Sequence, residues 1–180
     1  MISKLSLVQK SYLGVATYIS SDTSIEDLEQ YIKTNKHIFD EFKGIIVVSN
    51  YEYEIHIERN HTLWHKFFDN VIFIDLEINR GHTIGNLDSD GAVFDYCKEN
   101  KIDWLFKING DMLYFDEFLE GEVPEADFYY YNGIGYGGME KYKFDNDKII
   151  TDDFYPQTIQ YFINCSKLPR LHSKKVVDDA

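Results

Sequence analysis

The tripeptide Asn109-Gly110-Asp111 directly follows an apolar run, residues 104–108, that has the composition of a buried β-strand. A carboxylate at the carboxyl end of a strand is a hard oxygen ligand of the kind that Mg²⁺ or Mn²⁺ prefers. Asn109 would add a carbonyl oxygen to such a site. The same residue types are common in β-turns, so a plain turn also explains the tripeptide. Its position after a strand favours a metal site with Asp111 as the ligand.

A second polar segment, residues 79–85 (NRGHTIG), follows another apolar run. Its two glycines would allow backbone N–H groups and a helix start to face an anionic ligand. The imidazole of His82 would donate a hydrogen bond to a phosphate. The segment matches neither a Walker A loop nor a GxGxxG pattern, and a glycine-rich connection between a strand and a helix explains it equally well.

Alternating strands and helices are expected to position these segments. The patterns predict strands at residues 13–19, 45–48, 71–74 and 104–108, and helices after a capping box at residues 23–26 (TSIE), over residues 56–68 and over residues 86–100. This alternation implies right-handed crossovers and a mostly parallel sheet, whose ligands bind beyond the carboxyl ends of the strands. The polar loops that follow the strands are therefore expected at one edge of the sheet.

Lys107 is an unusual residue for the interior of a predicted central strand. A lysine there needs a charged partner or a route to solvent. Two interpretations stay open from the sequence: a side chain that reaches water near the sheet edge, or one that contacts a phosphate.

The length of the chain, 180 residues, indicates a single domain over residues 1–180. The alternating pattern occupies about residues 12–115. Aromatic and glycine-rich stretches then suggest a small additional α+β part over about residues 116–171, and residues 172–180 resemble a frayed tail. The aromatic tract at residues 128–131 (FYYY) fits either core packing or stacking on sugar faces.

The formal net charge of −13 disfavours binding to nucleic acids and to anionic membranes. A phosphorylated ligand of so acidic a protein would need a cation or oriented backbone donors to neutralise it. Cys97 and Cys165 have no CxxC spacing, so we expect neither a structural zinc site nor a disulfide framework. With no signal-peptide pattern and no long apolar run, we expect a cytoplasmic protein without an integral membrane segment.

The stretch NRGHTIGNLDSDGAVFDYCKENKIDWLFKINGD, within a similarity that covers about residues 12–115, resembles the nucleotide-sugar-binding half of GT-A-type glycosyltransferases, particularly their broad family two. In that family an Asn-x-Gly segment precedes a helix, and a hydrophobic strand ends in a DxD-like motif whose last acid holds a metal that bridges the diphosphate. Asn79, Gly81 and Asp111 match those places. Asn109 departs from the usual Asp, which removes one negative charge from the metal site.

The resemblance implies a GT-A (Rossmann-like) α/β fold, a mostly parallel central sheet with flanking helices, and a set of binding residues. The nucleotide-sugar-binding residues that the resemblance implies are Thr17, Tyr18, Ile19, Asn50, Asn79, Gly81 and Asp90, with Asp111 as the metal ligand. From their residue types and positions, we add His82, Lys107, Asn109 and Gly110 to the predicted nucleotide-sugar-binding residues. The catalytic base is expected after Asp111, where Asp152 and Asp153 are the first candidates and Glu140 is an alternative. A solvated surface carboxylate explains each of these three as well.

The implied reaction is transfer of a sugar from a nucleoside diphosphate sugar to a hydroxyl-bearing, glycan-like acceptor, with a divalent cation (Mn²⁺ or Mg²⁺) as cofactor. A non-catalytic nucleotide-sugar-binding module is an alternative because of Asn109 and the short second half. A sugar nucleotidyltransferase fits less well, because residues 20–23 (SSDT) lack the glycine and basic residues of a phosphate-binding loop.

Overall fold

The structure is a computed structural model that describes residues 1–51, 54–76, 81–109, 116–131, 139–142 and 160–167. In chain order its elements are β1 (Ile2–Ser3), α1 (Lys4–Lys10), β2 (Tyr12–Ile19), α2 (Asp22–Phe39), β3 (Gly44–Tyr51), α3 (Ile55–Phe67), β4 (Val71–Asp75), α4 (Gly81–Glu99), β5 (Trp104–Asn109), the 3₁₀ turn η1 (Asp116–Leu119), β6 (Glu122–Val123), β7 (Phe128–Tyr131), β8 (Met139–Tyr142), β9 (Gln160–Asn164) and the 3₁₀ turn η2 (Cys165–Lys167).

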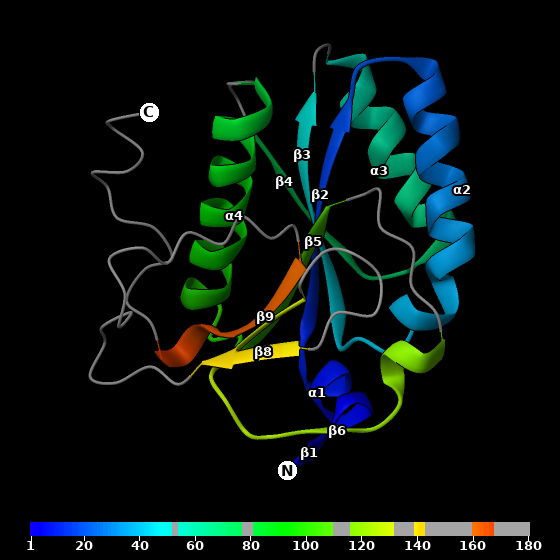
Figure 1. Cartoon of the computed structure of the whole chain (residues 1–180). Coiled ribbons are helices and arrows are strands. Elements are labelled where there is room, and N and C mark those ends of the chain that lie inside the picture. The colour runs from blue at the N-terminus through cyan, green and yellow to red at the C-terminus, as the bar shows by residue number, and fades with distance from the viewer. Residues whose placement is uncertain (52–53, 77–80, 110–115, 132–138, 143–159, 168–180) are drawn as a thin grey trace.

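The central sheet of the described residues has the strand order β4-β3-β2-β5-β9-β7-β8. The first four strands in this order are parallel, and β9, β7 and β8 extend the sheet through antiparallel pairs. Helices α2 and α3 cover one face, and α4 covers the other (Figure 1). The predicted α/β alternation is confirmed, and the sheet is mixed.

Strands β2 and β3 are buried on both faces, as their continuous apolar runs predict. Leu13 and Val15 pack into the cluster beneath α2 and α3, whereas Ile46 and Val48 pack into the cluster beneath α4. Helix α4 approaches β2 closely at Gly14, where an added Cβ would lie 3.0 Å from Val93 Cγ2 on α4 and 2.9 Å from Leu105 Cδ1 on β5.

Two predicted helix starts were wrong. Helix α2 begins at Asp22, because Ser21 accepts the capping hydrogen bond from the Ser24 N–H (3.2 Å), ahead of the capping box expected at residues 23–26. Helix α4 begins at Gly81 rather than at Asn86. Its early glycines have low helix propensity and predicted a loop, but propensity is a weak guide where a helix packs on a sheet.

Some elements were not predicted from the sequence, and others differ from their prediction. Helix α1 lies at the amino end of β2, where Leu7 and Val8 join the core, and the short β1 pairs with β6. In the C-terminal part, the described strands β7, β8 and β9 join the central sheet. Phe128 and Tyr129 are buried on opposite faces of β7, which makes them core residues.

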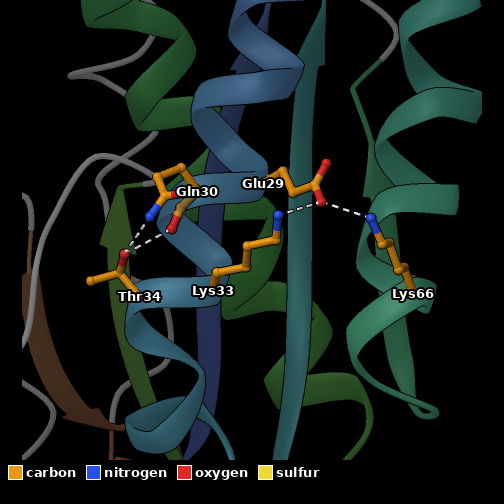
Figure 2. Close-up of polar contacts among 5 residues, drawn as sticks. All are labelled: Glu29, Gln30, Lys33, Thr34 and Lys66. Atoms are coloured by element: carbon orange, nitrogen blue, oxygen red, sulfur yellow. Dashed lines mark hydrogen bonds and ion pairs between the residues drawn. The ribbon is translucent and has the colours of Figure 1, made fainter.

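A surface ion-pair cluster joins α2 to α3 (Figure 2). The Glu29 carboxylate lies 2.8 Å from Lys33 Nζ on its own helix and 2.7 Å from Lys66 Nζ on α3. Hydrogen bonds from Lys33 and then Lys66 lower the pKa of Glu29 from 4.5 to about 2. The carboxylate therefore bridges the two helices that cover this face of the sheet.

This cluster predicts how stability changes with pH. The folded pKa of Glu29 lies below the unfolded one, so the ionised carboxylate stabilises the fold above about pH 4.5, and this stabilisation is lost as the pH falls toward about 2. In Lys66→Met the pKa of Glu29 should move back toward 4.5, measured by NMR titration of the side-chain carboxyl. Lys43→Met, a lysine near the Tyr12 ring, is the control and should leave that pKa in place. An unchanged pKa in Lys66→Met would contradict the bridge.

Candidate functional site

The sheet changes its direction of winding at β2. The chain proceeds from β2 to β3 and β4 on one side, and then crosses to β5 on the other side of β2 (Figure 1). In α/β sheets, ligands bind at such a switch point, beyond the carboxyl ends of the two diverging strands. The register places Asn109, the last residue of β5, beside Ala16 of β2. Strand β5 therefore ends at the switch point.

Tyr18 and Asn50 are neighbours at this edge, because the parallel register of β2 and β3 pairs them directly. Strand alternation places both side chains on the α4 side, together with Gly14 and Val48. The Tyr18 side chain is exposed (52%), whereas Asn50 is 7% exposed and its Oδ1 is buried with no hydrogen-bond partner among the described residues. A buried amide oxygen without a hydrogen-bond partner costs free energy. A ligand that donates a hydrogen bond to Asn50 would remove this cost, so we expect a ligand to bind beside Tyr18 and Asn50.

Thr17 and Ile19, the other predicted residues at the end of β2, face α2 and α3. Thr17 Oγ1 accepts a hydrogen bond from Asn60 Nδ2 at 3.4 Å, and the same amide donates to Ser49 Oγ at 2.7 Å. Ile19 is buried in the core, which leaves its backbone for a ligand. The fully buried Asn60 had no sequence signal apart from being polar on the apolar face of α3, yet it ties the ends of β2 and β3 together.

Lys107 and Asp90, both predicted as nucleotide-sugar-binding residues, form a buried ion pair. Lys107 Nζ on β5 lies 2.5 Å from Asp90 Oδ1 on α4, and the two side chains are 3% and 9% exposed. The interpretation in which Lys107 reaches solvent is therefore wrong. Tyr161 lies beside Lys107 in register on β9, and burial together with the negative charge of Asp90 raises the pKa of its hydroxyl. Lys107 would have to leave Asp90 to contact a phosphate.

Helices α2, α3 and α4 all begin at the carboxyl edge, after β2, β3 and β4 respectively. The aligned peptide dipoles give the start of a helix a positive partial charge, which favours anionic ligands at this edge. The first turn of α4 contains Gly81 and His82. Only Ser20 and Ser21 separate β2 from α2, which leaves no space for the phosphate-binding loop of a nucleotidyltransferase.

The remaining predicted residues lie outside the described ranges. They are Asn79, Gly110, Asp111, Asp152 and Asp153; for Asn109 the backbone alone is described, and Glu140 likewise is placed only as a residue of β8. Within the described ranges, no three side chains of His, Cys, Asp or Glu lie together in a group able to hold a metal ion.

Comparison of the chain with protein-family models and with curated protein sequences gives no match. The fold defines an α/β protein with a mixed sheet between two helical layers, and the functional assignment rests on the residues and the geometry above. None of the helices in the described ranges has the length and apolar character needed to cross a bilayer.

The Lys107–Asp90 pair predicts a large and specific stability effect. Asp90→Ala should lower the free energy of unfolding by about 3–5 kcal/mol, because it removes the carboxylate that compensates the buried ammonium of Lys107. The double variant Asp90→Leu/Lys107→Met should recover most of this loss, since it removes both charges. Chemical denaturation measures both values.

The control is the exposed pair of Lys36 and Asp40, whose charged atoms also lie close together, at 2.7 Å. Asp40→Ala should cost less than about 1 kcal/mol because water screens this pair. Equal losses for Asp90→Ala and Asp40→Ala, or a double variant no more stable than Asp90→Ala, would contradict the structural role of the buried pair.

Proposed function

We propose that this protein is a glycosyltransferase of the GT-A type, which transfers a sugar from a nucleoside diphosphate sugar to a hydroxyl-bearing acceptor. The observation that carries the proposal is the convergence of predicted binding residues at the switch point. Tyr18 and Asn50 are paired there in register, and β5 ends there at Asn109. The edge of the sheet at which α/β proteins bind ligands thus carries Tyr18, Asn50 and Asn109, three of the residues that we propose to bind the nucleotide-sugar.

In this proposal the nucleoside occupies the edge formed by Tyr18 and Asn50. The exposed phenol ring of Tyr18 provides a flat apolar surface for a base, and the Asn50 amide provides the hydrogen-bonding group. The diphosphate then extends toward Asn109 and the first turn of α4, where backbone N–H groups favour its negative charge.

The proposed cofactor is Mn²⁺ or Mg²⁺ held by Asp111, and its fit rests on the charge of the site. The ion pair with Asp90 already neutralises Lys107, so the one basic side chain of β5 does not offset a diphosphate. A divalent cation supplies that positive charge when it is bound, and Asp111 follows β5 by two residues. The acceptor hydroxyl would lose its proton to a carboxylate, for which Asp153 or Asp152 is proposed.

A non-catalytic module that binds a nucleotide-sugar is the second candidate. Asn109 favours it, because an amide in place of the usual carboxylate removes one negative charge from the proposed metal site. The short connection of Ser20 and Ser21 between β2 and α2 argues against a sugar nucleotidyltransferase.

Nucleotide binding is tested by thermal unfolding with a panel of nucleoside diphosphates, each with and without Mn²⁺. At a ligand concentration of about 100 Kd, the Tm should rise by roughly 5 °C or more, and the rise should depend on the cation. Asp111→Ala should abolish the part of the rise that depends on Mn²⁺. The control is Asp103→Ala, an exposed carboxylate just before the opposite end of β5, which should keep the full rise.

The same experiment separates the two candidates when it is followed by an assay of donor hydrolysis and sugar transfer. Turnover that is lost in Asp111→Ala supports the glycosyltransferase, whereas binding without turnover supports the module. The absence of stabilisation by every nucleoside diphosphate would refute both.

Tyr18→Ala tests the proposed base-binding surface. Because Tyr18 is exposed, the Tm of the unliganded variant should stay near that of the wild type. Its affinity for the nucleoside diphosphate should fall by about 10-fold, since stacking of one base on an aromatic ring contributes about 1–3 kcal/mol. Isothermal titration calorimetry measures the change, and Leu5→Ala, an exposed apolar residue on α1, is the control. Unchanged affinity in Tyr18→Ala would place the base elsewhere.

A further inference from the structure

Cys97 and Cys165, which are far apart in the sequence, meet beneath α4. Cys97 is on the sheet-facing side of α4, and Cys165 is the first residue of η2, directly after β9. Both are free thiols with no exposed surface, both belong to the same buried cluster, and α4 packs against η2. Their contact could not be predicted from the sequence, because they share neither a motif nor a short spacing.

The backbone holds the two cysteines in place through a shared connection. The Cys97 carbonyl accepts a hydrogen bond from the Ile102 N–H (2.8 Å), and the Cys165 N–H donates to the Asp103 carbonyl (2.7 Å). Ile102 and Asp103 are consecutive residues in the link between α4 and β5. The backbone segments that carry the two thiols are therefore held near each other by main-chain bonds to the same connection, in addition to the packing of their side chains.

We propose that Cys97 and Cys165 are a site of reversible oxidation, at which hydrogen peroxide converts the two thiols into an intramolecular disulfide. One thiol loses its proton, and its thiolate attacks a peroxide oxygen, so that the S–O bond of a sulfenic acid forms and the O–O bond breaks. The hydroxide that leaves takes up the released proton and becomes the first water. The second thiol then attacks the sulfenic sulfur, so that the S–S bond forms and the S–O bond breaks. Its proton leaves with the oxygen as the second water. The two thiols lose two electrons in total, and the peroxide gains them.

Access to the oxidant requires a local opening, and η2 is the element that provides it. It is a single 3₁₀ turn, and the two residues that follow Cys165, Ser166 and Lys167, are exposed. A single turn with exposed residues opens at lower free-energy cost than a core helix. The hydrogen bond with Cys97, followed by burial, raises the pKa of Cys165, so its thiol is a poor nucleophile while the turn is closed. The reaction should therefore be slow and limited by opening.

The disulfide would tie α4 to η2 and close the chain between residues 97 and 165 into a covalent loop. This loop contains β5 and the segment that follows Asn109. A cross-link of this span restricts the unfolded chain strongly, so the oxidised protein should unfold at a Tm about 5–10 °C higher than the reduced protein.

The test treats the folded full chain with hydrogen peroxide, blocks the remaining thiols with N-ethylmaleimide in denaturant, and maps the peptides without reduction. The expected product is a monomer with no blocked thiol and a peptide that links Cys97 to Cys165. Dithiothreitol should restore two thiols and the original Tm. Cys97→Ala and Cys165→Ala are the controls, and neither should show a rise in Tm after peroxide.

The wild-type measurement decides the proposal even if either variant folds poorly. Two thiols that remain open to N-ethylmaleimide after peroxide treatment would overturn it. So would sulfinic acid on a single cysteine, or disulfide-linked dimers, because each shows that the pair does not close within one chain.

Discussion

The arrangement of this protein depends on one electrostatic constraint, which is the ammonium of Lys107 buried in the middle of the sheet. A charge at such a position costs several kcal/mol unless a charged partner meets it. Asp90 is that partner, and so α4 must lie with this residue toward β5. Helical periodicity then turns Val93, Phe94 and Cys97 toward the same face of the sheet, where all three are buried.

The rotation of α4 set by this pair has consequences at both ends of the helix. Toward its C-terminus it brings Cys97 against Cys165, and over the sheet it brings Val93 so close to β2 that the residue beneath it is Gly14. Toward its N-terminus it fixes the first turn at the carboxyl edge, after β4. A helix is stiff over this length, so a bond in its middle controls the position of its start.

The local pattern of apolar residues was sufficient to predict the elements that have a continuous apolar run or a regular helical spacing of apolar residues. Strands β2, β3, β4 and β5, and helix α3, were found close to their predicted bounds, because burial alone explains their residue types. The GT-A assignment stays a prediction. The edge at which Tyr18 and Asn50 meet was also predictable, since it follows from strands that alternate with helices.

What the sequence did not reveal are interactions between distant elements. Lys107 and Asp90 were each selected for the nucleotide, and nothing in their separate contexts shows that they neutralise each other. The early start of α4 and the contact between Cys97 and Cys165 were missed for the same reason. Both depend on how a helix packs on a sheet, whereas propensity and spacing describe only neighbours along the chain.

The charge balance at the carboxyl edge links the fold to the proposed chemistry. In a chain of net charge −13, two cations near this edge are already paired, Lys107 with Asp90 and Arg59 at the start of α3 with Asp22 at the start of α2. The first pair joins α4 to β5, and the second joins α3 to α2. Because both cations are paired, less positive side-chain charge remains to bind an anion. An anionic ligand would then be held by backbone N–H groups at the helix starts and by a bound cation. If the proposed diphosphate binds at this edge, its charge would therefore be offset by the helix starts and by the proposed divalent cation rather than by Lys107 or Arg59.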